Sequence, residues 1–184
     1  DLADTGAGAA WVYTAGGGVW GQQGAKFVDT GAVGPARQGC SVAISADGNT
    51  ALVGGWFDNN GAGAAWVYTR SGGVWSQHGT KLVGTGAVGP AEQGWSVALS
   101  ADGNTAVVGG DNDDAFTVPG VGTVGRGAAW VYTRSGGVWS QQGAKLVGTG
   151  AVGSATQGYA VSLSTDGNTA VVGGFGGGVW AFTR

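Results

Sequence analysis

Aromatic rings next to Asp and Asn side chains are the part of this sequence best suited to bind a ligand. Trp56, Phe57, Asp58, Asn59 and Asn60 follow one another directly. A ring can stack on the apolar face of a sugar while amide and carboxylate groups bind its hydroxyls, and the same mixture suits a protein interface. We therefore predict that Trp56, Phe57, Asp58 and Asn60 contact a ligand.

A second group of the same kind follows further along the chain. Asp111, Asp113 and Asp114 form the densest acidic cluster, and Phe116 follows two residues after Asp114. The cluster has two interpretations: a weak cation site, or a solvated loop start, which we favour. We add these four residues, together with Phe175, to the predicted ligand-binding set.

Short motifs recur in a fixed order and must position these side chains. AAWVYT occupies 9–14, 64–69 and 128–133, and a degenerate VWAFT ends at 183. Between these copies lie GGVW, QG-x-x-V and DGNTA. The tryptophan of AAWVYT precedes the aspartate of DGNTA by 36 residues in every copy. The distance from that aspartate to the next tryptophan varies, at 19, 28 or 14 residues. Insertions of this kind lie in loops on one face of a repeat protein, and the candidate residues all fall in the variable connection.

Each motif has the pattern of a β-strand. AWVYT alternates in side-chain type, TAVVGG is a short apolar run, and Asp-Gly-Asn and Arg-Ser-Gly-Gly favour hairpin turns. We predict four antiparallel strands per repeat and 13 strands in all, with the fourth strand long (138–147) and interrupted by a glycine. The fold class is therefore all-β: a β-propeller of four-stranded antiparallel blades, with a little over three blades per chain.

The repeat boundaries follow from the motifs. We expect a single repeat domain, 1–184, made of a partial blade (1–34), two repeats (35–89 and 90–153) and a partial repeat (154–184). Because the blades at both ends are incomplete, we expect the chain to self-associate and close a homodimeric ring of about six or seven blades.

The stretch QGWSVALSADGNTAVVGG, followed by a loop and GAAWVYTR, resembles the FG-GAP repeat of integrin-like β-propellers, in its bacterial form. The resemblance covers essentially the whole chain. It implies a propeller fold and, in many members, a calcium loop between the first two strands. Here that loop is reduced to Ser-Ala-Asp-Gly-Asn-Thr, and one carboxylate cannot supply the 6–8 oxygen ligands of calcium. We therefore predict no cofactor, and turn roles for Asp47, Asp102 and Asp166.

Residues that could act in catalysis show no shared pattern across the repeats. His78 replaces a glutamine of the other copies, and Glu92 aligns with Arg37 and Thr156. Cys40 aligns with Trp95 and Tyr159, so we expect a buried apolar position there. The recurring lysines are expected to be edge-strand charges that discourage aggregation: Lys26, Lys81 and Lys145. We predict a protein that is not an enzyme.

Composition narrows the class of partner. Only 10% of the residues are charged and the formal net charge is −3, so nucleic acid is not an expected partner. The longest apolar runs are far shorter than the ~20 residues of a membrane span, which argues against membrane insertion. Gly makes up 42 of 184 residues, as expected for many turns. With no Met or signal-like segment at Asp1, we expect a processed or excised piece of a longer protein.

These observations lead to one function and two alternatives. We expect an extracellular or cell-surface module that binds a protein or a glycan through its variable loops. The alternatives are a purely structural spacer in a larger surface or adhesive protein, and a lectin. A lectin with one site per blade is less favoured because the loops differ between copies. For Trp56, Phe57 and Phe175, filling the gaps between neighbouring repeats is an equally good interpretation.

Overall fold

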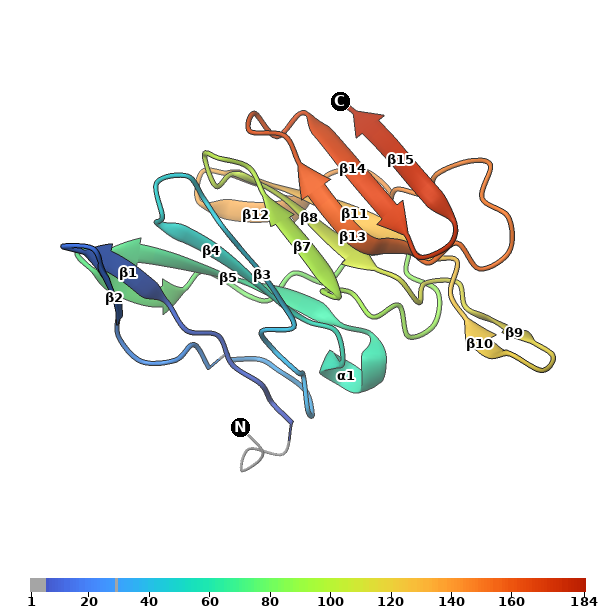
Figure 1. The fold of residues 1–184 in the computed structure, drawn as a ribbon, viewed down its shortest axis with the longest axis horizontal. Coiled ribbons are helices and arrows are strands. Elements are labelled where there is room, and N and C mark those ends of the chain that lie inside the picture. Colours follow the sequence, from blue (N-terminus) through green and yellow to red (C-terminus); the bar gives the residue numbers. More distant parts are fainter. Residues whose placement is uncertain (1–5, 29) are drawn as a thin grey trace.

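The computed structural model describes residues 6–28 and 30–184, and within them the protein is all-β (Figure 1). These residues form 15 strands and one short helix, α1 (Asp58–Gly61). The strands are β1 (Tyr13–Gly16), β2 (Val19–Gln22), β3 (Ser41–Ile44), β4 (Thr50–Gly55), β5 (Ala64–Ser71), β6 (Val74–Gln77), β7 (Ser96–Leu99), β8 (Thr105–Gly110), β9 (Phe116–Val118), β10 (Gly122–Val124), β11 (Ala128–Ser135), β12 (Val138–Gln141), β13 (Gln157–Leu163), β14 (Thr169–Gly174) and β15 (Gly178–Thr183).

The repeats fold into antiparallel sheets whose strand order follows the sequence. The two complete repeats form the sheets β3-β4-β5-β6 and β7-β8-β11-β12, and the last repeat forms β13-β14-β15. The first copy is the hairpin β1-β2. The predicted four-stranded unit is therefore confirmed. The longest connection adds a hairpin, β9-β10, that the motifs did not predict, so the strand number exceeds the expected 13 by two.

The fourth strand of each repeat is shorter than predicted. In the second repeat it is β12, and pairing with β11 stops at Gln141. It resumes at a single bridge between Leu146 and Ala129. The glycine at 143 has a φ of +70°, which an extended strand cannot accommodate. The prediction of one long strand over 138–147 is therefore wrong.

The turns between the first and second strands follow the sequence prediction. In the central copy Asp102 Oδ1 accepts hydrogen bonds from Ser100 Oγ at 2.6 Å and from the backbone N–H of Asn104 at 3.0 Å. These bonds hold the pKa of Asp102 below its usual range. The carboxylates of Asp47 and Asp166 accept the corresponding bonds. The turn role of these aspartates is confirmed.

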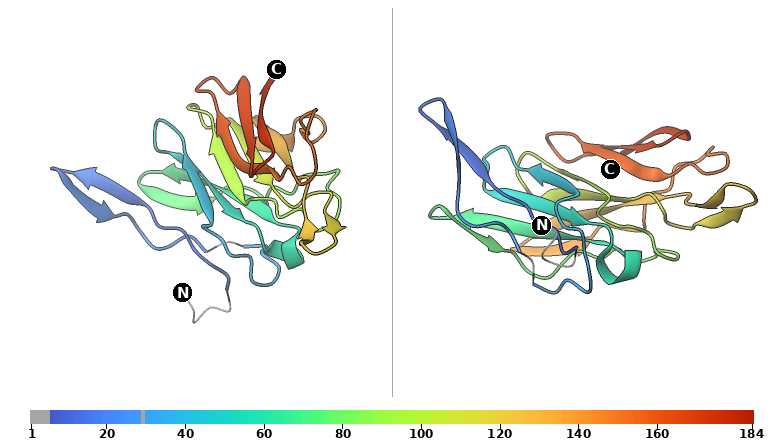
Figure 2. Two further views of the ribbon diagram at one scale, coloured as in Figure 1. Left: turned by 45° about the vertical axis from the view of Figure 1, so that its right-hand side comes forward. Right: turned by 60° about the horizontal axis from the view of Figure 1, so that its bottom comes forward.

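Neighbouring sheets pack face to face, with the first strand of one sheet, β7 or β13, against the first and second strands of the preceding sheet. The β1-β2 hairpin extends away from them (Figure 2). All six residues of β4 and of β8 are buried. Both strands end in Gly-Gly, and the first glycine of each pair lies directly against the next repeat. A Cβ on Gly109 would lie 2.2 Å from the carbonyl oxygen of Gly158. The indole of Trp130 is fully buried in the core that forms between two sheets.

Among the described residues, no helix has the length and apolar character needed to cross a lipid bilayer.

Candidate functional site

A continuous row of aromatic rings crosses the three sheets that begin with β3, β7 and β13. It lies at the end of these sheets where β4, β8 and β14 finish. Trp56 contacts Phe57 and Trp95, with ring centroids 5.1 and 5.4 Å apart. Trp95 contacts Tyr159 at 5.9 Å, and Tyr159 contacts Phe175 at 5.6 Å. We call these five residues the aromatic ladder. Exposure rises along it, since Trp56, Phe57 and Trp95 are half-buried whereas Tyr159 is 44% and Phe175 73% exposed.

Two kinds of position supply the ladder. Trp56 and Phe175 begin the variable connections after β4 and β14. Trp95 and Tyr159 come from the repeat itself, because each directly follows a Gln-Gly pair. The aligned position in the first repeat is Cys40, whose thiol donates to the carbonyl oxygen of Gly94. Cys40 is exposed. The expectation of a buried apolar slot is therefore wrong, since the aligned Trp95 is half-buried and Tyr159 is 44% exposed.

Charged groups flank the half-buried end of the ladder. The guanidinium of Arg37 lies 4.7 Å from the Trp56 ring centroid and 4.9 Å from that of Phe57. Burial, together with the negative charge of Asp111, raises the pKa of Glu92 to about 7. Burial also raises the pKa of Asp111 to about 6, and its Oδ1 has no hydrogen-bond partner within the described part of the chain.

The aligned positions Arg37, Glu92 and Thr156 share a backbone conformation, although their chemistry differs. Their φ angles are +55°, +57° and +44°, in the left-handed region. Such angles are costly for a residue with a side chain and persist only where the surroundings impose them. What the repeats share at this position is therefore a backbone conformation and not a side-chain chemistry. Its side chain is free to vary beside the ladder, and the repeat alignment alone could not show this.

Asp58 and Asp113 lie inside the protein. Each carboxylate is 1% exposed and pairs with a lysine ammonium, Asp58 with Lys81 at 2.5 Å and Asp113 with Lys145. The other oxygen accepts a backbone N–H from the crossover of the preceding repeat, that of Val33 at 2.7 Å for Asp58. This corrects the expectation that Asp58 and Asp113 face a ligand: both oxygens already have internal partners. The view of Lys81 and Lys145 as edge-strand charges is wrong for the same reason.

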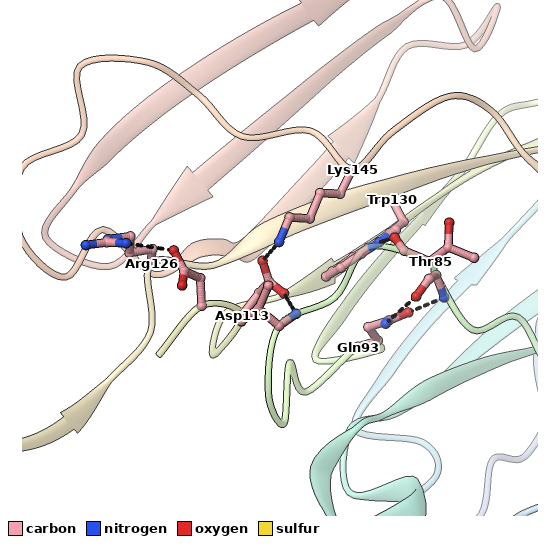
Figure 3. A network of polar contacts seen from close by, with 9 residues as sticks. Thr85, Gln93, Asp113, Arg126, Trp130 and Lys145 are labelled. Atoms are coloured by element: carbon pink, nitrogen blue, oxygen red, sulfur yellow. Dashed lines mark hydrogen bonds and ion pairs between the residues drawn. The ribbon is translucent and has the colours of Figure 1, made fainter. Parts of the chain in front are cut away.

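Figure 3 shows how the central copy uses this arrangement. Asp113 accepts the backbone N–H of Val88 at 2.8 Å. The indole N–H of Trp130 donates to the carbonyl oxygen of Thr85 at 2.9 Å, and the Gln93 amide exchanges two hydrogen bonds with Gly84. Together these contacts fix the crossover that links one sheet to the next.

The remaining candidates do not join the ladder. Asp114 pairs with Arg126 at 2.7 Å, and Arg126 lies 5.1 Å from the centroid of the Phe116 ring. Asn60 is exposed and has a φ of +58°. Asp111, Asp113 and Asp114 thus turn to different surroundings. No cluster of three or more potential metal-ligating carboxylates, histidines or cysteines occurs within residues 6–28 and 30–184.

Sequence reasoning therefore found three members of the ladder, Trp56, Phe57 and Phe175, and missed Trp95 and Tyr159. The sequence carries no signal that the position after Gln-Gly is exposed. An aromatic residue in a repeated strand reads equally well as core, and only the neighbouring sheet decides which it is.

No protein-family model matches the chain, and a search of curated proteins finds no significantly similar relative. The resemblance to the FG-GAP repeat thus depends on the recurring motifs.

Proposed function

We propose that this chain is a non-enzymatic binding module of the β-propeller class, and that its ligand is a glycan held along the aromatic ladder. The observation that carries the proposal is the unbroken contact from Phe57 to Phe175 across three repeats. Separate core plugs would not need to touch one another across sheet boundaries. A row of rings with increasing exposure offers successive flat surfaces to the apolar faces of linked sugars.

The flanking polar groups suit such a ligand. Glu92, Asp111 and Arg37 lie beside the half-buried end of the ladder and offer hydrogen-bond acceptors and donors to hydroxyl groups. The packing of neighbouring sheets through their first and second strands supports the propeller interpretation, with each sheet as one blade. An extracellular or cell-surface location fits a ligand of this kind.

A protein ligand is the second candidate, and one observation favours it. Arg37 lies over two ladder rings, and Trp, Tyr and Arg are the residues that most often dominate the binding energy of protein interfaces. A protein ligand would use the same surface. The test below separates the two because it presents glycans alone.

The test is a glycan array followed by titration calorimetry of each positive glycan. Tyr159→Ala removes a solvent-exposed ring and should weaken binding about tenfold. Tyr159→Phe keeps the ring and should bind within about twofold of the parent, because the ring face is what the ligand contacts. Phe116→Ala is the matched control, since Phe116 lies outside the ladder beside Arg126.

Two results would overturn the proposal. One is an array with no binding by a chain whose circular dichroism and thermal melt show it to be folded, which would favour a protein ligand or a spacer. The other is binding that Tyr159→Ala leaves unchanged, which would place the glycan elsewhere.

A further inference from the structure

The tryptophan of each fourth strand fits into a socket built by its own repeat and the preceding one. Trp75 of β6 is the first example. Its indole N–H donates to Gln23 Oε1 at 3.1 Å, and its ring lies 5.5 Å from the ring of Phe27. The guanidinium of Arg70 covers the ring at 5.5 Å. Gln23 and Phe27 belong to the preceding copy, so the tryptophan fastens two repeats together.

The second socket repeats this arrangement with Trp139 of β12. Arg134 lies 5.5 Å from its ring centroid, and the ring packs against the core cluster that contains Leu82 and Tyr132. His78 stands where the first socket has Gln23, and the indole nitrogen of Trp139 has no hydrogen-bond partner in the described part of the chain. The socket therefore holds a tryptophan by packing even when that hydrogen bond is lost.

The third socket is an open cavity of about 320 Å³. Its walls are the equivalents of the residues that surround Trp75: Gln142 for Gln23, Leu146 for Phe27, Phe182 for Tyr68 and Arg184 for Arg70. The strand beside it, β15, pairs with β14 and has an unpaired edge within the described residues. The cavity and this edge together match a fourth strand that carries a tryptophan.

The other end of the described chain carries such a strand. β2 has the sequence Val-Trp-Gly-Gln, against Val-Trp-Ser-Gln in β6 and β12. Its Trp20 is 71% exposed, whereas Trp75 and Trp139 are half-buried in their sockets. β2 is paired with β1 in a two-stranded hairpin, an arrangement of marginal stability by itself.

We propose that the third socket receives Trp20 of a second copy of this chain, so that copies join head to tail. In the first complete sheet Tyr68 is paired with Gln77 and Arg70 with Trp75. The second sheet has the same register, with Tyr132 opposite Gln141 and Arg134 opposite Trp139. The same register on β15 places Phe182 opposite Gln22 and Arg184 opposite Trp20. Because β1 occupies the edge of β2 that this register requires, β2 exchanges β1 for the partner's β15. A joint of this kind is heterologous, and it makes a closed ring or an open chain according to its angle. The proposed joint between copies does not depend on the ligand of the aromatic ladder.

The experiment is sedimentation velocity of the full 184-residue chain over a range of concentrations, with matched variants. Trp20→Ala should weaken association about 30-fold or more, as expected for a tryptophan at the centre of an interface. Ala144→Glu places a charge at the mouth of the third socket and should have the same effect. Val121→Ala removes an apolar side chain of similar exposure, 73% against 71% for Trp20, that lies outside both the joint and the ladder, and it should leave association unchanged.

Mixing the two variants that should not self-associate, Trp20→Ala and Ala144→Glu, gives the most specific test of the joint. The Trp20→Ala chain keeps an intact socket and the Ala144→Glu chain keeps an intact tryptophan, so an equimolar mixture should form heterodimers with one joint. A peptide with the sequence of residues 134–142 should compete with this joint, and the same peptide with alanine in place of tryptophan should not.

A parent chain that stays monomeric would overturn the proposal and leave the socket to a different strand. Association that persists in Trp20→Ala, or a mixture that stays monomeric while the parent associates, would also overturn it.

Discussion

Strands β8 and β14 have the same sequence, TAVVGG, and opposite surroundings. All six residues of β8 are buried, whereas in β14 two are buried and the others are partly or fully exposed. The sheet of β8 lies between two neighbouring sheets, while that of β14 is the last of the described chain (Figure 1). Identical local sequence thus gives the same strand and pairing in both places, and the neighbours alone decide what each side chain contributes to stability.

The largest expected difference between these regions concerns the tryptophans of the third strands. Trp130 is fully buried, and Trp180 is half-buried. Trp130→Ala should lower the free energy of unfolding by about 3–5 kcal/mol, and Trp180→Ala by about 1–2 kcal/mol, since less apolar surface and a smaller cavity are involved. Urea denaturation of both variants measures this. Equal losses would show that the last sheet is covered in solution.

A second difference between these regions is the crossover segment, which Asp113 holds in place in one and no described carboxylate holds in the other. Removal of the Asp113 carboxylate should abolish this difference. Asp113→Ala leaves Lys145 without its carboxylate and the Val88 N–H without its acceptor, and should cost about 3 kcal/mol. The corresponding segment of the last repeat is Phe-Gly-Gly-Gly, and the equivalent Val152 is 88% exposed, against 52% for Val88. By hydrogen exchange, the crossover at 85–89 of the variant should become as fast as that at 149–153.

The double variant Asp113→Ala/Lys145→Ala is the control for this prediction. It should lose less than the sum of the two single variants, because no unpaired charge remains. Strict additivity would mean that the two side chains do not interact in solution.

The terminal glycine pairs test the closeness of the next repeat. Neither Gly109 of β8 nor Gly173 of β14 has a positive φ, so the backbone conformation allows alanine at both positions. A Cβ on Gly109 would meet a carbonyl oxygen at 2.2 Å, whereas on Gly173 the nearest atom would be 3.7 Å away. Gly109→Ala should destabilise by about 1–3 kcal/mol, and Gly173→Ala should be neutral or stabilise by about 0.5 kcal/mol. Thermal melts of the two variants distinguish these outcomes, and two neutral substitutions would contradict the close packing of the sheets.

The smallest effect is a pH dependence that the last repeat lacks. The folded-state pKa of Glu92 is raised to about 7, so the folded protein binds more protons than the unfolded chain between about pH 4.5 and 7. The contribution of Glu92 is therefore fully present below pH 4.5 and is lost as the pH rises through 7. After allowance for solvent screening at this half-buried site it amounts to about 1 kcal/mol.

Glu92→Gln should flatten this dependence, leaving a smaller slope from Asp111, whose pKa is about 6. The aligned residue of the last repeat is the neutral Thr156, so Thr156→Ser is the matched control and should leave the pH profile of stability unchanged. Denaturation midpoints from pH 4 to 8 test both variants. An unaltered slope in Glu92→Gln would mean that another group carries the titration.

Much of the fold could be predicted because its signals are local. The alternation in AAWVYT and the Asp-Gly-Asn turns depend on backbone geometry within a few residues, so strand order and hairpins followed directly. The β9-β10 hairpin was missed because its strands are three residues long and lie in a loop whose length varies between copies. The candidate site was predicted in part: Trp56, Phe57 and Phe175 stood out in variable loops, whereas Trp95 and Tyr159 looked like core.

The sequence by itself determined the repeating four-strand unit, its hairpin turns and the scarcity of catalytic groups. Only the tertiary structure decided that Asp58 and Asp113 are internal partners of lysines, that five rings form one ladder, and that one tryptophan socket is open while Trp20 is exposed. The physical reason is that strand formation depends on residues adjacent in the chain. Burial and contact depend on which sheet lies opposite, and identical repeats cannot encode that difference.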